Sequence, residues 1–139
     1  MFDTNVFIYL YSDDESVKRE IAQKAVNKYE CVISTQVLNE FSSICIRKLY
    51  KNPGEVELAI DEMIGQCIVL TLEKEDIKRA IGLHKKLGYN YYDCLMIVSA
   101  LKSDCNYLLT EDLADGQTIE GKLIIVNIFS SENAKKYFM

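Results

Sequence analysis

The stretch YYDCLMIVSALKSDCNYLLT, residues 91–110, decides the fold, because a helix without a polar face is followed at once by a short apolar strand. On a wheel of about 100° per residue, the apolar side chains of residues 94–101 point in every direction. A helix of this kind must be covered on all sides, including the side of Asp93 in its first turn. The following segment, NYLLT at 106–110, is short and apolar enough to be a buried strand of the sheet.

The same alternation of strand and helix extends in both directions along the chain. Further strands are predicted at ECVIS (30–34), CIVLTL (67–72) and KLIIVNIF (122–129), with residues 2–3 ending a short first strand. Helices are predicted at residues 4–12, 14–28, 36–50, 54–64, 73–87 and 91–103. Short apolar strands separated by helices pair in parallel and carry helices on both faces. We therefore expect an α/β fold, a three-layer α/β/α sandwich with a mostly parallel sheet of about four or five strands.

Length and composition place the chain among ordinary globular proteins. Its 139 residues, 49% apolar and 27% charged, fit a single domain spanning residues 1–139. No apolar run approaches the roughly 18 residues of a membrane span, and the start lacks a signal-peptide pattern, so a cytoplasmic protein without a membrane segment is expected. The five cysteines have no C-x-x-C spacing, which favours reduced core thiols over a zinc site or a disulfide framework.

The net charge of −5 argues against a protein that holds nucleic acid mainly through a broad basic surface. It does not exclude a nuclease, because carboxylates gathered around metal ions make the chain acidic while the ions restore positive charge locally.

Four acidic residues occupy positions that are unusual when taken together. Asp3 and Asp112 each follow a predicted strand, Asp93 lies in the first turn of the buried helix, and Glu40 borders the apolar stripe of helix 36–50. Each has an ordinary explanation. Asp3 would be a helix cap and Asp112 a turn residue. Asp93 would be stabilised by the helix dipole, and Glu40 would be a boundary glutamate. Their joint position at one edge of the sheet, where α/β proteins bind ligands, is the informative feature.

Carboxylates that converge repel one another and lose hydration, which is a net cost unless cations lie between them. A set of oxygen ligands suits Mg²⁺ or Mn²⁺. One reaction that these residues could perform with such ions is hydrolysis of a phosphodiester bond, in which a carboxylate accepts the proton of the attacking water. Cleavage of RNA through its 2′-hydroxyl by a pair of histidines is excluded, because His84 is the sole histidine and lies in a predicted amphipathic helix.

Four motifs resemble, in order and spacing, those of PIN-domain ribonucleases, especially the VapC-type toxins of toxin–antitoxin pairs. The motifs are FDTNVFIY (2–9), TQVLNEF (35–41), YYDCLMIVSAL (91–101), and LLTEDLADG (108–116) followed by LIIVNIF (123–129). The resemblance implies a Mg²⁺- or Mn²⁺-dependent endoribonuclease with RNA as substrate, a small antitoxin as partner and a homodimeric assembly.

The resemblance also assigns residues. It implies that Asp3, Glu40, Asp93 and Asp112 are the catalytic, metal-binding quartet, with Asn5 and Thr110 supporting it. Asp115 is an alternative or additional metal ligand beside Asp112. Only two residues precede Asp3, fewer than is usual in the family, so a weakened central strand is expected.

Other features of the sequence are weaker candidates for function. Arg47, Lys48 and Lys51 would contact RNA phosphates or simply complement the helix dipole. The segment GQTIEGK (116–122) has phosphate-loop spacing, but it lacks the following Ser or Thr and leads into a strand, so nucleotide binding is rejected. Asn5 stands where an Asp-nucleophile phosphatase carries its second aspartate, which disfavours that class. The remaining alternative is a catalytically silent PIN-like module that binds RNA or protein.

Overall fold

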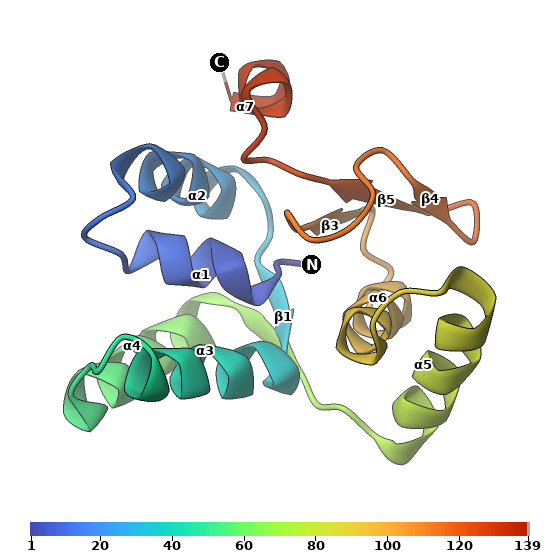
Figure 1. The fold of residues 1–139 in the computed structure, drawn as a ribbon, viewed down its shortest axis with the longest axis horizontal. Helices are drawn as coiled ribbons and strands as arrows, with labels where there is room; N and C mark the ends of the chain where they lie inside the picture. The colour runs from blue at the N-terminus through green and yellow to red at the C-terminus, as the bar shows by residue number, and fades with distance from the viewer. Residues whose placement is uncertain (139) are drawn as a thin grey trace.

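The computed structural model describes residues 1–138, and Figure 1 shows their arrangement. The helices are α1 (Thr4–Leu10), α2 (Ser16–Lys28), α3 (Thr35–Arg47), α4 (Pro53–Gln66), α5 (Lys74–Leu87), α6 (Tyr91–Lys102) and α7 (Ser131–Phe138). The strands are β1 (Val32–Ser34), β2 (Ile68–Leu70), β3 (Tyr107–Leu109), β4 (Thr118–Ile119) and β5 (Leu123–Val126).

The strands form two groups that the first residues of the chain join into one sheet. β1 pairs in parallel with β2, β3 pairs in parallel with β5, and β4 runs antiparallel to β5. Phe2 lies between the groups: its N–H donates to the carbonyl of Val32 at 2.9 Å, and it forms a parallel bridge with Leu109. The expectation of a mostly parallel sheet is confirmed, and the antiparallel part is confined to β4.

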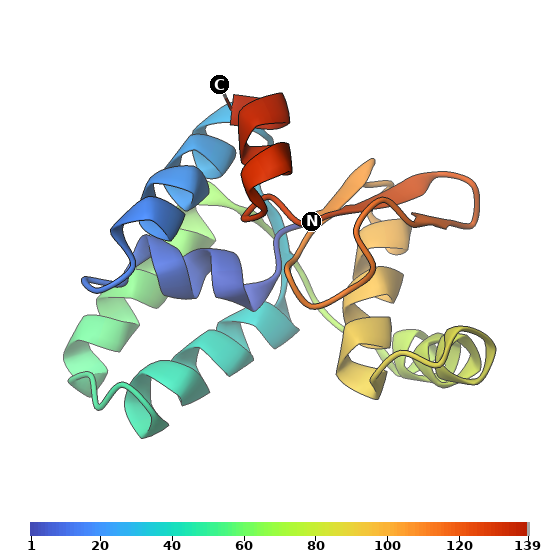
Figure 2. The same cartoon turned by 45° about the horizontal axis from the view of Figure 1, so that its top comes forward.

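The short N-terminal segment lies between the two groups of strands and forms an isolated bridge there instead of a full strand. Met1 and Phe2 are 5% and 1% exposed, the carbonyl of Met1 accepts the Leu109 N–H at 2.9 Å, and the terminal ammonium donates to the carbonyl of Tyr107 at 2.9 Å. Phe2 therefore contacts strands on both of its sides, but through a single bridge, which agrees with the expectation of a weakened strand. Figure 2 shows the N-terminus in the middle of the molecule, between the two groups of helices.

Helices cover the sheet on both sides, as the three-layer prediction requires. α1 to α4 lie on one side and α5 and α6 on the other, with β1 between them (Figure 1). α6 packs against α5, β1 and β3, and its residues 94–101 are all buried. The apolar segment that follows Asp3 also packs inward, with Val6 and Phe7 at most 2% exposed. Residues 8–11 are half-buried and pack against this core.

The first turn of α6 differs from the expectation that Asp93 points into the interior. Tyr92 is 60% exposed and Asp93 is half-buried, whereas complete burial begins only at Cys94. The reason is that α6 begins at the edge of the sheet, where Asn90 caps it by accepting the Tyr92 N–H at 2.9 Å. The acid therefore lies at the rim of the sheet.

Several boundaries also differ from the sequence-based ones. The helix predicted at 36–50 begins one residue earlier, at Thr35 with Ser34 as N-cap, and ends at Arg47. Both β4 and α7 were missed, because a two-residue strand and an eight-residue helix leave little periodicity to detect. The segment 116–122 contains β4 and the turn that follows it, with Gly121 at φ 70°, and it leads into β5 instead of opening a helix, as expected.

No helix among residues 1–138 combines the length and apolarity that a membrane span needs. All five cysteines are free thiols, three of them buried, as expected for reduced core residues.

Candidate active site

Asp3 is held at the exit of the central strand. Its N–H donates to the carbonyl of Leu109 at 3.0 Å, which continues the sheet for one residue beyond Phe2. One carboxylate oxygen accepts the Thr4 N–H at 2.6 Å, and the other accepts the Thr110 hydroxyl at 2.6 Å. Asp3 is therefore the N-cap of α1, as the ordinary explanation required, yet it is only 8% exposed, which is unusual for a capping carboxylate.

The environment of Asp3 opposes its negative charge. The pKa of Asp3 is raised to about 6, mainly by burial and to a smaller extent by the carboxylates of Asp112 and Glu40. The hydrogen bonds from Thr110 and Thr4 lower the pKa and offset only part of this rise. No basic side chain among residues 1–138 contributes to lowering it, so capping alone does not explain the placement of this charge.

Glu40 reaches the same place from α3. One of its carboxylate oxygens accepts the Thr4 hydroxyl at 2.7 Å, and the other accepts the side-chain amide of Gln36 at 2.8 Å. Thr4 thus donates its backbone N–H to Asp3 and its hydroxyl to Glu40. This threonine ties the acid of the central strand to the acid of α3.

Asp93 enters from the first turn of α6. Its pKa is raised by burial and then by the carboxylates of Asp112 and Glu40. Among residues 1–138 no hydrogen-bond donor contacts its side chain, so both of its oxygens are available to a ligand.

Asp112 follows β3 and is exposed at the surface. Its carboxylate accepts the side-chain amide of Asn5 at 3.1 Å, and its backbone N–H donates to the hydroxyl oxygen of Thr110 at 3.2 Å. Burial raises its pKa, followed by the charges of Glu111 and Glu40. Asn5 and Thr110 therefore both contact acids of the quartet, and their supporting role stays a prediction.

The four acids come from four separate segments of the chain, and Asp112 and Glu40 act on the others. Carboxylates raise the pKa of Asp3, Asp93 and Asp112, and no lysine or arginine among residues 1–138 contributes to lowering it. Such a cluster of oxygen donors without a countercharge fits a hard divalent cation. Within residues 1–138, no three His, Cys, Asp or Glu side chains are gathered closely enough to coordinate one ion together. Mg²⁺ commonly needs only one or two carboxylates and completes its shell with water, so the donor set remains suitable.

Asp115 has a different role in this structure. Its carboxylate accepts the backbone N–H of Asn127 at 2.8 Å and the side-chain amide of Asn133 at 2.9 Å, through both oxygens in the second case. It does not contribute to the raised pKa values of Asp3, Asp93 or Asp112. These contacts tie the turn after β3 to α7 and favour Asp112 over Asp115 as a metal ligand.

Two residues that contact the acids were missed in the sequence. Thr4 was hidden in its motif between Asp3 and Asn5, and Gln36 stands four residues before Glu40, on the same face of α3. That spacing was the available signal for Gln36.

The other candidates lie outside the cluster. His84 is exposed on α5 and contacts the carbonyl of Tyr89 at 2.6 Å, which agrees with a surface residue. Arg47 and Lys48 are exposed at the end of α3, and Lys51 lies 4.0 Å from Asp13. Their contact with RNA stays a prediction.

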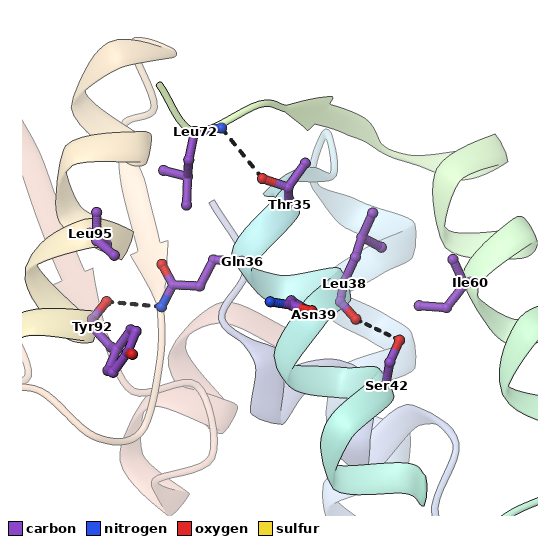
Figure 3. A pocket seen from close by; sticks show the side chains of 9 residues that line it. All are labelled: Thr35, Gln36, Leu38, Asn39, Ser42, Ile60, Leu72, Tyr92 and Leu95. Atoms are coloured by element: carbon purple, nitrogen blue, oxygen red, sulfur yellow. Dashed lines mark hydrogen bonds between the residues drawn. The ribbon is translucent and has the colours of Figure 1, made fainter. Parts of the chain in front are cut away.

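A cavity of about 450 Å³ opens beside the acids, between α3 and α6, and Figure 3 shows its lining. Its wall includes Gln36, which contacts Glu40, and Tyr92, which precedes Asp93. None of the four acids lines the cavity itself, which runs along the surface of α3 next to the site.

Comparison with known proteins agrees with the geometry. The chain is similar to a solved toxin–antitoxin complex from Klebsiella pneumoniae, with 20% identity, a TM-score of 0.67, and 88% of this chain and 93% of that chain covered. It is also similar to VapC20 of Mycobacterium tuberculosis, described as a sarcin-ricin loop cleaving toxin, with 15% identity, a TM-score of 0.63, and coverage of 80% and 88%. At these identities the likeness shows a shared fold. No curated protein matches in sequence.

The family model of the PIN domain matches residues 1–114, which include all four acids of the quartet and end just before Asp115. This match covers most of the chain and agrees with the three-layer architecture and the acidic edge. The chain belongs to the PIN domain family.

Proposed function

We propose that this protein is a metal-dependent endoribonuclease and the toxin of a VapBC-type toxin–antitoxin pair. The observation that carries the proposal is the convergence of Asp3, Glu40, Asp93 and Asp112 at one edge of the sheet. The charges of Asp112 and Glu40 raise the pKa values of Asp3 and Asp93, and the charge of Glu40 raises that of Asp112, with no compensating basic side chain among residues 1–138. The two structural relatives, a toxin–antitoxin complex and an RNA-cleaving toxin, support the same class of activity.

The quartet would hold Mg²⁺ or Mn²⁺. When bound, such an ion supplies positive charge to the scissile phosphate and makes a water molecule more acidic. Asp3 and Glu40 are fixed by hydrogen bonds on both of their oxygens, so they provide the rigid part of the site. Thr4 joins these two acids and maintains their relative position.

Asp93 is the best placed proton acceptor of the quartet. No donor among the described residues contacts its carboxylate, and its raised pKa makes it a stronger base than an ordinary aspartate. We propose that it accepts the proton of the water that attacks the phosphodiester bond. Asn5, through its hydrogen bond to Asp112, would hold that carboxylate toward the same space.

Partners follow from the same proposal. We expect a small antitoxin that covers the acidic edge, and RNA as the substrate, in the cytoplasm. A homodimer is also proposed, and it is supported by large apolar side chains that are exposed in this chain. Examples are Ile64 on α4, and Ile77 and Ile81 on α5, which are 50%, 44% and 47% exposed.

The alternative is a catalytically silent PIN module that binds RNA or protein. It is favoured by one observation, that no three acidic side chains among residues 1–138 are close enough to share an ion directly. The two proposals differ in whether metal is required for an effect on RNA.

An RNA cleavage assay separates them. The nuclease proposal predicts cleavage that depends on Mg²⁺ or Mn²⁺, stops with EDTA and is lost in Asp93→Asn. The matched control is Asp61→Asn, which removes an exposed acid of α4 and should leave cleavage unchanged. Binding of RNA that is independent of metal and occurs without cleavage would support the silent module.

A further inference from the structure

Gln36 is buried at the start of α3 and connects two of the acid-bearing helices. It is 7% exposed, and its side-chain nitrogen donates to Glu40 Oε1 at 2.8 Å and to the backbone carbonyl of Tyr92 at 3.0 Å. Figure 3 shows the second of these hydrogen bonds, which crosses from α3 to the first turn of α6. Because Tyr92 directly precedes Asp93, one amide group joins Glu40 to the backbone that carries the next acid.

The chemistry of the partners fixes the orientation of the amide. A carboxylate oxygen and a backbone carbonyl oxygen both accept hydrogen bonds, so the nitrogen of Gln36 must face them. Each of its two hydrogens then has one acceptor. The oxygen Oε1 must point the other way, and it is buried without a hydrogen-bond partner among the described residues.

That unpartnered oxygen shows that stability alone does not explain a glutamine here. A buried acceptor without a donor is unfavourable for folding, and an apolar side chain of similar length would avoid the cost. The benefit of the amide therefore lies with its nitrogen, which contacts Glu40 and the start of α6.

Glu40 is held from two directions as a result. Thr4, on α1, donates to Oε2, and Gln36 donates to Oε1. Loss of Gln36 would free one oxygen of Glu40 and remove the hydrogen bond between α3 and the turn that carries Asp93.

We propose that Gln36 is a positioning residue of the acidic site, which fixes the orientation of Glu40 and the spacing between α3 and the Asp93 turn for binding of a divalent cation. This inference rests on the proposed metal-dependent function. It adds a residue that touches neither the metal nor the RNA and acts through Glu40.

The test measures binding of Mn²⁺ alone by isothermal titration calorimetry, without RNA. Gln36→Met keeps the length of the side chain, removes both donors and also removes the unpartnered oxygen. We expect Mn²⁺ affinity to fall about tenfold or more, in the range usual for residues that orient metal ligands. The thermal unfolding midpoint in EDTA should not fall, because the variant loses an unfavourable buried acceptor.

Asn39→Met is the matched control. Asn39 lines the same cavity one turn along α3, is exposed, and makes no side-chain hydrogen bond among the described residues. Its replacement should leave Mn²⁺ affinity unchanged.

A double-mutant cycle distinguishes positioning from a general loss of structure. In a Glu40→Gln background, Gln36→Met should produce little further loss, because the residue acts through Glu40. Wild-type affinity in Gln36→Met, or an equal loss in both backgrounds, would overturn the inference. If the unmodified protein binds no Mn²⁺ at all, the metal site itself is refuted, and the inference with it.

Discussion

Replacing Asp3 by asparagine should stabilise the metal-free protein at neutral pH. The carboxylate is 8% exposed, and its pKa rises from 3.8 to about 6, so its charged form is unfavourable in the folded state. Well below pH 3.8 the carboxyl group is protonated in both the folded and the unfolded state, so its raised pKa does not change the free energy of unfolding. The cost grows as the pH rises from 3.8 to about 6. Above that pH the full difference opposes folding.

The magnitude follows from the shift. A rise from 3.8 to about 6 corresponds to about 3 kcal/mol of lost stability at pH 7.5. Asparagine would still accept the Thr4 N–H, but its amide would donate toward the Thr110 oxygen, which already accepts the Asp112 N–H. The Thr110 hydroxyl then loses its acceptor, at a cost of about 1 kcal/mol. A net gain of about 2 kcal/mol is expected.

Urea unfolding in EDTA, at pH 7.5 and at pH 3.5, measures this difference. Asp3→Asn should unfold at higher urea than the unmodified protein at pH 7.5, and the gain should disappear at pH 3.5. Asp61→Asn, which replaces an exposed acid, serves as control and should show no gain at either pH. An Asp3→Asn variant that is equally or less stable at pH 7.5 would refute the claim that this charge is uncompensated.

Three further outcomes are expected. Thr110→Val removes the hydroxyl that donates to Asp3 and accepts from the Asp112 N–H. The kcat for RNA cleavage should fall about tenfold, while the circular dichroism spectrum shows that the variant is folded. An unchanged kcat would count against a supporting role for Thr110. Asp115→Asn should keep the Mn²⁺ affinity but lower Tm by a few degrees, because the Asp115 carboxylate accepts hydrogen bonds from Asn127 and Asn133. Loss of Mn²⁺ binding in this variant would instead identify Asp115 as a metal ligand. Ile81→Glu places a charge beside the exposed Ile77 on α5 and should convert the proposed dimer to a monomer, as measured by the molar mass from light scattering. An unchanged molar mass would place any dimer interface elsewhere.

Much of the fold could be predicted because burial leaves a strong pattern in the sequence. Residues 94–101 of α6 are apolar on every side, and residues 107–109 form a short apolar strand, so helix, strand and layer order followed directly. Gly88, in the left-handed conformation at φ 75°, ended α5 where the sequence indicated. β4 and α7 could not be predicted, since their place depends on contacts with β5 and α2 that local sequence does not encode.

The candidate site, too, could be predicted from the sequence only in part. The positions of Asp3 and Asp112 after strands could be read from the sequence, because the ends of parallel strands share one edge. The hydrogen bonds from Thr4 and Gln36 could not, because they depend on how α1, α3 and α6 approach one another. Asp93 was placed too deep, since the apolar pattern of α6 does not show that its first turn projects beyond the sheet.

The most direct measurement is a crystal structure of the protein soaked in Mn²⁺, with anomalous difference density used to locate the ion. If the acids form the metal site, a peak should lie among the carboxylates of Asp3, Glu40, Asp93 and Asp112, with at least two of them within coordinating distance, and none should lie at Asp115. Mn²⁺ bound only elsewhere, or no ordered ion at the acidic edge, would contradict this assignment.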